Sequence, residues 1–169
     1  YIRVYTTIAY SAKKADESIK NMGYVLHCFN CFHRETKKGL FGLQSSQECD
    51  ECGSKTDFAG ALWLGKIFDR EFCELVEEKA KRIPLRNSEK IRKTLTLVKD
   101  EADAPITYYV LDAISSKLTL PVPSVRVVLQ ALRQQGFQAV STHFSSKGIR
   151  TNATARIVKE TLRKICSRK

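Results

Sequence analysis

Four of the six cysteines form two Cys-x-x-Cys pairs, Cys28 with Cys31 and Cys49 with Cys52. A Cys-x-x-Cys turn presents two thiolates on one side of a tight loop, and two facing turns provide the tetrahedral sulfur set that zinc prefers. Gly53 follows the second pair, where a sharp turn favours a residue that tolerates positive φ. The spacer of seventeen residues is long enough to leave as one strand and return as another. We therefore predict a zinc ribbon.

Three other uses of these cysteines need to be weighed against zinc. Disulfides are disfavoured because nothing in the sequence indicates secretion. A redox dithiol is disfavoured because it needs only one of the two pairs. Iron in a rubredoxin-like site stays open, since the spacing alone does not separate it from zinc. Four thiolates leave no free position for a substrate, so we expect a structural site, with His27 and His33 beside it rather than in it.

The formal net charge of +11 is concentrated near the end of the chain. Residues 121–169 carry ten basic side chains and one acidic one, whereas residues 1–60 and 61–120 each have a net charge of +1. Such a one-sided segment indicates a polyanionic partner. We expect nucleic acid rather than an acidic membrane, because no amphipathic anchor with a broad aromatic face accompanies the charge. No apolar run approaches about eighteen residues and no signal peptide is present, so we expect an intracellular protein without a membrane span.

The elements that position these residues can be read from periodicity and caps. One helix is predicted after residue 11. Two more are predicted after the N-caps Asp69 and Ser88. In the helix after Asp69, Phe72, Leu75 and Val76 are among the residues expected on the buried face. Alternating residues 1–10 predict an opening strand, and a strand without a nearby partner suggests that the chain is a piece of something longer.

From residue 106 the order of elements is distinctive. A helix over 106–118 and a turn precede a second helix, which Ser124 caps and Gly136 ends. A strand, a turn over 145–148, a second strand and a last helix follow. This is the winged-helix order. The overall prediction is an α+β fold with a zinc ribbon and a winged-helix-like C-terminal domain.

Basic side chains in this predicted domain are candidates for phosphate contacts. On the second helix Arg126 and Arg133 form a polar stripe opposite the buried one. His143, beside Phe144, is a candidate to stack on or hydrogen-bond an RNA base or ribose. The full set of expected RNA contacts is Arg126, Arg133, His143, Lys147, Arg150, Arg156, Lys159 and Arg163.

Five stretches together resemble the tRNA guanine-26 dimethyltransferases. In order they are "YIRVY", "AKKADE", "GYVLHCFNC", "LWLGKIFDREF" and "STHFSSKGIRT". Two positions depart from the family: Ala61 stands where proline is frequent, and Ser141 where arginine is frequent. The resemblance implies a doubly wound domain that binds S-adenosylmethionine, and a C-terminal domain that helps to hold the tRNA. It also implies tRNA as partner and methylation of the guanine exocyclic amine as the activity.

The resemblance divides the chain into three parts. Residues 1–22 correspond to the final strand and helix of the methyltransferase domain, 23–87 to the ribbon and a linking helix, and 88–169 to the C-terminal tRNA-binding domain. The glycines do not cluster into an S-adenosylmethionine loop. We therefore expect the α/β domain that binds S-adenosylmethionine to lie outside this sequence, and this chain to be a monomer that is inactive alone.

Two rival functions are consistent with the same basic segment. One is a free-standing zinc-ribbon and winged-helix module that binds DNA, although such a module has no use for an unpaired opening strand. The other is a protein-interaction domain whose basic end serves solubility. Competition between tRNA and duplex DNA separates the first from tRNA binding, and weak binding of all nucleic acids, insensitive to salt, would support the second.

Overall fold

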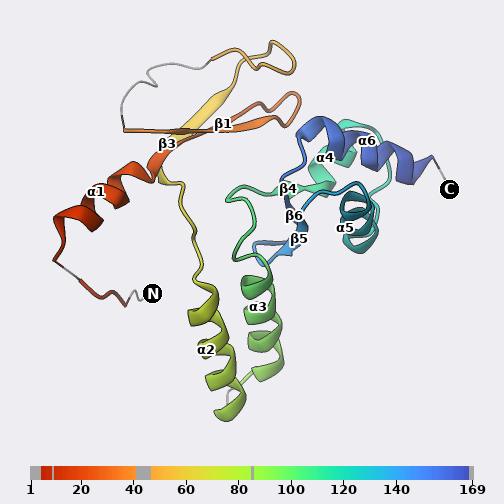
Figure 1. Ribbon diagram of the computed structural model, residues 1–169. Helices are drawn as coiled ribbons and strands as arrows, with labels where there is room; N and C mark the ends of the chain where they lie inside the picture. The colour runs from red at the N-terminus through yellow and green to blue at the C-terminus, as the bar shows by residue number, and fades with distance from the viewer. Residues whose placement is uncertain (1–4, 9, 41–46, 85, 168–169) are drawn as a thin grey trace.

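The computed structural model describes residues 5–8, 10–40, 47–84 and 86–167, which form a small sheet, a helical hairpin and a C-terminal α/β part (Figure 1). Helix α1 (Ala12–Lys20) begins at Ser11, whose side chain accepts a hydrogen bond from the Lys14 backbone N–H. The sheet that follows has the order β2-β1-β3, with both pairings antiparallel. Its strands are β1 (Met22–His27), β2 (Arg34–Lys38) and β3 (Asp57–Trp63).

Gly23 allows the central strand β1 to lie close to both of its neighbours. A Cβ atom at this position would lie 2.2 Å from the Lys37 carbonyl oxygen and 2.6 Å from a methyl carbon of Leu64. The register to β3 shifts between Gly23 and Tyr24. A glycine inside a strand pattern often marks a close approach of this kind.

The predicted opening strand is absent from the part of that stretch that the structure describes. Residues 5–8 and 10 have no regular structure, and the side chains of Tyr5 and Ile8 are 82% and 85% exposed. Ile2 and Val4, which the alternation places on the same face, lie outside the described residues. Alternation alone does not form a strand, because its backbone groups need a pairing partner.

Helices α2 (Arg70–Arg82) and α3 (Ser88–Asp100) pack side by side as a hairpin. Asp69 caps α2 as predicted, accepting a hydrogen bond from the Phe72 backbone N–H at 2.8 Å. The cap of α3 is Asn87 rather than Ser88, and its side chain makes no capping hydrogen bond.

The buried face of α2 differs from the predicted one. Phe72 and Leu75 are 64% and 50% exposed, whereas Cys73 is buried and Val76 is half-buried. Within the described residues α2 packs mainly on α3, so only the narrow stripe that faces that helix is covered. A periodicity argument that assumes a broad core overestimates how much of such a helix is buried.

The C-terminal part contains a second sheet of order β4-β6-β5 with three helices around it. Its core includes Ile114, Leu132, Ile149 and Leu162, all fully buried. The side chain of Ser124 caps α5 as predicted. The elements are β4 (Tyr109–Val110), α4 (Leu111–Lys117), α5 (Val125–Gln134), β5 (Ala139–Thr142), β6 (Ser145–Thr151) and α6 (Ala155–Cys166).

Two predictions for this part were wrong. Tyr109 and Val110 form β4, which pairs with Ile149 and Gly148, instead of belonging to the first helix. The hairpin turn between β5 and β6 lies at residues 143–144 and not at 145–148, so Lys147 lies within a strand. The turn predicted over 145–148 includes Gly148, but this glycine lies in β6 and serves packing, since a Cβ there would lie 2.5 Å from a methyl carbon of Thr142. Among the residues described, no helix combines the length and apolarity needed to cross a bilayer.

Candidate metal centre and basic surface

The four paired cysteines meet in one cluster, as their spacing predicts. Their Sγ atoms all lie within 4.8 Å of one another. Each close contact joins the two knuckles: Cys28 Sγ lies 3.5 Å from Cys52 Sγ, and Cys31 Sγ lies 3.5 Å from Cys49 Sγ. Cys52 is exposed and the other three are buried. One thiol at the surface gives an ion a route to the cluster.

The two knuckles share one backbone pattern. In the first, the Phe32 N–H donates to the Cys28 carbonyl at 2.8 Å, and the Cys28 N–H donates to the His33 carbonyl at 2.9 Å. In the second, the Gly53 N–H donates to the Cys49 carbonyl at 2.8 Å. The Cys49 N–H likewise donates to the Ser54 carbonyl at 2.8 Å.

The residue after each pair has a left-handed backbone. Gly53 has φ of 68° and Phe32 has φ of 66°. Glycine adopts this conformation without steric cost, whereas a bulky residue such as phenylalanine does so only where its surroundings hold it there. Phe32 also packs against the core of the C-terminal part. The first knuckle is therefore anchored on its outer side as well as at its thiols.

Polar contacts connect the knuckles outside the sulfur cluster. Asn30 Nδ2 of the first knuckle donates to Ser54 Oγ of the second at 2.9 Å. Within the first knuckle, the His33 backbone N–H donates to Cys31 Sγ at 3.4 Å. His33 Nδ1 lies 3.2 Å from a carboxylate oxygen of Glu51. His33 thus connects the two knuckles through its side chain, and His27 accepts a hydrogen bond from Arg34 Nε at 3.3 Å.

The donor set and its size fit a metal ion bound by four sulfurs. A tetrahedral ion with bonds of about 2.3 Å holds its sulfurs about 3.8 Å apart, close to the two measured contacts. Burial raises the pKa of the Cys31 and Cys49 thiols, whereas hydrogen bonds from Ser54 lower the pKa of Cys52 to about 6. A bound cation compensates the cost of ionising the buried thiols.

The sheet that carries this centre contacts the C-terminal part. The Arg34 guanidinium on β2 lies over the Tyr109 ring on β4, 4.7 Å from its centroid. Burial lowers the pKa of Arg34. Together with the packing of Phe32, this contact places one knuckle and the adjoining strand against the C-terminal part. The first knuckle is therefore in direct contact with this junction.

Most of the residues predicted to contact RNA lie at the surface of the C-terminal part. Arg126 and Arg133 lie on α5 and line a shallow hollow with Leu129, Gln130 and Gln134. Arg133 already makes a hydrogen bond within the protein, because its Nε donates to the Ala139 carbonyl at 2.8 Å. Lys147 on β6 and Arg156 and Arg163 on α6 are exposed, and Lys159 is half-buried. The structure thus brings exposed basic groups onto three elements of this part.

Arg150 and His143 have a different environment. Arg150 is 1% exposed, and its Nε lies 2.8 Å from Glu101 Oε2 in an ion pair. Glu101 is fully buried and also accepts a hydrogen bond from the His143 backbone N–H at 3.1 Å, while its Oε1 contacts His143 Nδ1. Arg150 Nη1 donates to the Pro105 carbonyl at 3.1 Å. The Arg150 guanidinium therefore faces a carboxylate of the protein instead of solvent.

Aromatic rings surround this buried cluster. The Arg150 guanidinium lies 5.8 Å from the Phe68 ring centroid and 5.5 Å from that of Phe144. Phe144 is 55% exposed and is stacked on Tyr108 with centroids 5.8 Å apart. No sequence pattern distinguishes Glu101 from the other acids of the charged helix that it follows, and none points to Phe68.

Comparison with known proteins identifies relatives along nearly the whole chain. Residues 1–163 match the family model described as N2,N2-dimethylguanosine tRNA methyltransferase. A tRNA (guanine(26)-N(2))-dimethyltransferase of Methanobrevibacter smithii is 37% identical over 167 residues, which is 99% of this chain and 43% of that protein. A tRNA (guanine(26)-N(2)/guanine(27)-N(2))-dimethyltransferase of Aquifex aeolicus is 34% identical over 155 residues, which is 90% of this chain and 37% of that protein. The chain thus spans about two fifths of the length of these relatives.

A solved structure has the same arrangement. Trm1 from Pyrococcus horikoshii, in complex with S-adenosyl-L-methionine, superposes with a TM-score of 0.74 at 26% sequence identity. The match covers 89% of this chain and 38% of that one.

Proposed function

Because this chain belongs to the N2,N2-dimethylguanosine tRNA methyltransferase family, we propose that it is the tRNA-binding C-terminal portion of a tRNA guanine-26 dimethyltransferase. The observation that carries the proposal is the exposed basic surface of the C-terminal part. Arg126 on α5 and Arg156 and Arg163 on α6 are exposed, and Glu160 is the one acid after residue 112 in the sequence. Guanidinium groups bind RNA phosphates and set the orientation of the RNA.

In this proposal the order of elements over residues 109–166 is a winged helix with an added strand. Helix α5 presents Arg126 to the RNA, and Lys147 reaches it from β6. Arg150 supports this surface from beneath through its ion pair with Glu101. His143 contributes to the same support, and its half-buried ring lies beside the exposed Phe144 at the hairpin turn.

The metal in the four-cysteine centre is proposed to be zinc with a structural role. All four positions of a tetrahedral ion are taken by thiolates, so no site remains for a substrate. The ion's contribution is to hold the two knuckles together, and through Phe32 and Arg34 to hold the sheet against the C-terminal part. Folding and metal binding are then coupled.

Methyl transfer itself is assigned to the rest of such an enzyme. It requires S-adenosylmethionine held in line with the guanine amine and a group that accepts the amine proton. We propose that a separate α/β domain supplies both and that the present chain alone is inactive. Residues 1–22 would adjoin that domain, 23–87 would form the ribbon and linking helix, and 88–169 would bind the tRNA. The protein is proposed to act as an intracellular monomer.

The rival function as a free-standing DNA-binding module is not favoured by the comparisons, since the relatives described above act on tRNA. Its test is direct. Binding of this chain to tRNA should be tighter than to duplex DNA of equal charge and should weaken steeply with salt. Duplex DNA that displaces tRNA at equal concentration would reverse the assignment.

A matched pair of variants locates the binding surface. Arg126→Gln, Arg156→Gln and Arg163→Gln together remove three charges from the proposed surface. Each lost phosphate contact lowers the slope of log K against log salt by about 0.9, so we expect a decrease of about 2–3. The control, Lys13→Gln, Lys14→Gln and Lys20→Gln, removes the same charge from the exposed helix α1. Equal losses in the two variants would mean that only the net charge matters.

A further inference from the structure

The far end of the α2–α3 hairpin is strongly basic. Residues 79–93 carry seven basic side chains and one acidic one, Glu89. The same two helices are acidic at the opposite end: residues 69–78 carry five acids and one base, and residues 94–103 carry three acids and one base. These charges cancel across the hairpin. The average over residues 61–120 therefore hides a tip with a net charge of +6.

Local ion pairs neutralise only part of the tip. Lys81 lies 3.6 Å from Glu77, Lys93 lies 2.7 Å from Glu89, and Arg82 pairs with Glu78. Lys79, Arg86, Lys90 and Arg92 make no ion pair with any residue that the structure describes. These last four and Lys81 are called the tip cluster below. Four of its five charges thus have no counter-ion within the described protein.

Helix stability explains only part of the tip cluster. Basic residues in the last turn of α2 complement the helix dipole, which accounts for Lys79 and Lys81. Lys90, however, lies in the first turn of α3, where the dipole is already positive, and Arg92 follows in the next turn. Arg86 lies in the connection between the helices. Like charges that repel one another and oppose the dipole indicate an anionic partner.

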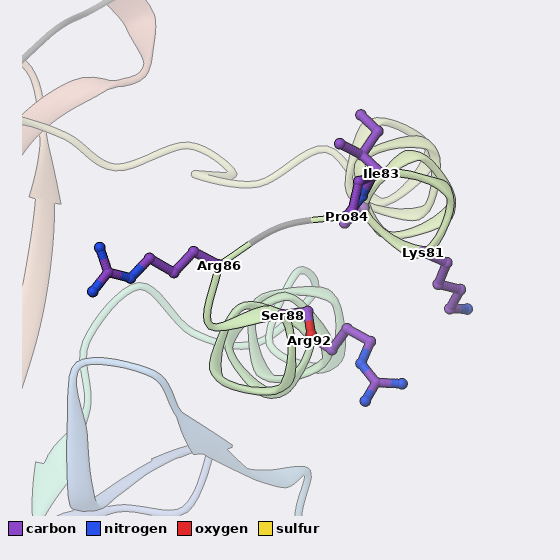
Figure 2. A pocket seen from close by; sticks show the side chains of 7 residues that line it. Lys81, Ile83, Pro84, Arg86, Ser88 and Arg92 are labelled. Carbon is purple, nitrogen blue, oxygen red and sulfur yellow. The ribbon is translucent and has the colours of Figure 1, made fainter.

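The hairpin carries this charge away from the rest of the molecule. Each helix has thirteen residues and is therefore about 20 Å long. Figure 1 shows the turn at the end furthest from both sheets. The turn region is hollowed, and residues of both helices and of their connection line the hollow, among them Lys81, Arg86 and Arg92. In Figure 2, Lys81 and Arg92 extend to one side of the hairpin and Arg86 to the other, so the cluster presents charge on two sides.

We propose that the tip cluster is a second RNA-binding surface, which contacts tRNA phosphates at a place separate from the surface on α5 and α6. This inference rests on the proposed tRNA-binding function. Flexible, exposed basic side chains without a rigid base-reading surface suit phosphates rather than bases. An anionic membrane is disfavoured as the partner, because Ile83 is the one large apolar side chain exposed among the described residues of the tip.

The experiment compares three triple variants of this chain in tRNA binding across a salt series. The tip variant is Lys81→Gln, Arg86→Gln and Arg92→Gln. The other two are the α5/α6 variant and the α1 control described above. Glutamine keeps good helix propensity, and unchanged melting temperatures confirm folding. We expect the tip variant to lower the salt slope by about 2–3 and the affinity by about tenfold to hundredfold at 0.15 M salt, with the α1 control unaffected.

The outcomes separate the inference from the proposed function. A tip variant that matches the α1 control, with a weakened α5/α6 variant, overturns the inference and leaves the function intact. Binding to tRNA that none of the variants weakens overturns both. Loss of binding to phosphatidylserine vesicles by the tip variant, with an unchanged tRNA slope, overturns the inference in favour of a membrane. Hydroxyl-radical footprinting adds an independent measure, since the tip and α5/α6 variants should lose protection at different nucleotides.

Discussion

Replacement of Glu101 by glutamine tests the buried charge cluster that joins the root of the hairpin to the C-terminal sheet. Glu101 and Arg150 are 0% and 1% exposed, and they face each other at 2.8 Å. In the Glu101→Gln variant the guanidinium keeps its hydrogen bond to the Pro105 carbonyl but loses its anion. Burial already lowers the pKa of Arg150, and the Glu101 charge is what opposes that shift. The variant therefore leaves a buried cation without compensation.

The size of the effect follows from the burial. Removal of one partner of a buried ion pair costs about 3–5 kcal/mol, which is a large part of the roughly 5–15 kcal/mol that stabilises a typical domain. With a urea dependence of about 2 kcal/mol per molar, the midpoint of unfolding should fall by about 2 M. Urea titrations at pH 7, followed by far-UV circular dichroism, measure this midpoint.

Two controls make the result specific. Glu101→Gln combined with Arg150→Met removes both charges and should recover much of the lost stability, because no buried charge is then left without a partner. Asp103→Asn alters an exposed acid nearby and should have a much smaller effect. A loss below about 1 kcal/mol in the single variant, or a double variant no more stable than the single one, would show that the pair does not hold this junction.

Three further predictions concern the metal centre and pH. Removal of metal with a chelator should release about one zinc ion per chain, measured by atomic emission, and should shift the Tyr109 ring signals in NMR because Arg34 lies on that ring; unchanged signals would contradict the coupling. Gly53→Ala should lower stability by about 1–2 kcal/mol through backbone strain alone, since φ is 68° and a Cβ there meets no atom within 4 Å; a thermal melt equal to that of the parent chain would refute this. Hydrogen bonds from Lys66 and Arg70 lower the pKa of Asp103 in the folded state. The Asp103 carboxylate therefore stabilises the fold above the pKa that it has in the unfolded chain, and this stabilisation is lost as pH falls through the folded-state pKa. Asp103→Asn should therefore flatten the acid limb of a stability–pH profile below about pH 4, and an unaltered limb would exclude this pair as its source.

Features set by local chemistry were predictable from the sequence. Each cysteine pair is confined to a short turn, so only the fold of the spacer is needed to bring the two pairs together. The thiols that meet are those of Cys28, Cys31, Cys49 and Cys52. Ser124 caps its helix because a side chain three residues before a free N–H needs no tertiary partner. Local rules of this kind depend on few residues, so they hold before the fold is known.

Features set by distant partners were not predictable. The basic segment around Arg150 predicts a phosphate contact for this residue, and only the fold reveals that Glu101 lies opposite it. Gly148 signals a turn in the sequence, yet it serves the close approach of Thr142 across the hairpin. The charge of the hairpin tip does not show in the average charge of the surrounding sequence, for a different reason. Acidic residues close in sequence balance it, although in the fold most of them lie towards the other end of helices that are about 20 Å long.

The Glu101–Arg150 pair has a consequence for the proposed binding of RNA. Glu101 follows the last residue of α3, and Arg150 belongs to the central strand of the C-terminal sheet, so this buried contact connects the hairpin to that sheet. This contact helps to hold the two basic surfaces, the one on α5 and α6 and the tip cluster, at a set separation. If both proposed surfaces bind RNA, an RNA that places phosphates at both would gain the free energy of two contacts, whereas a shorter or straighter one would gain only one. In that case the shape of the RNA, rather than its base sequence, would decide how tightly it binds.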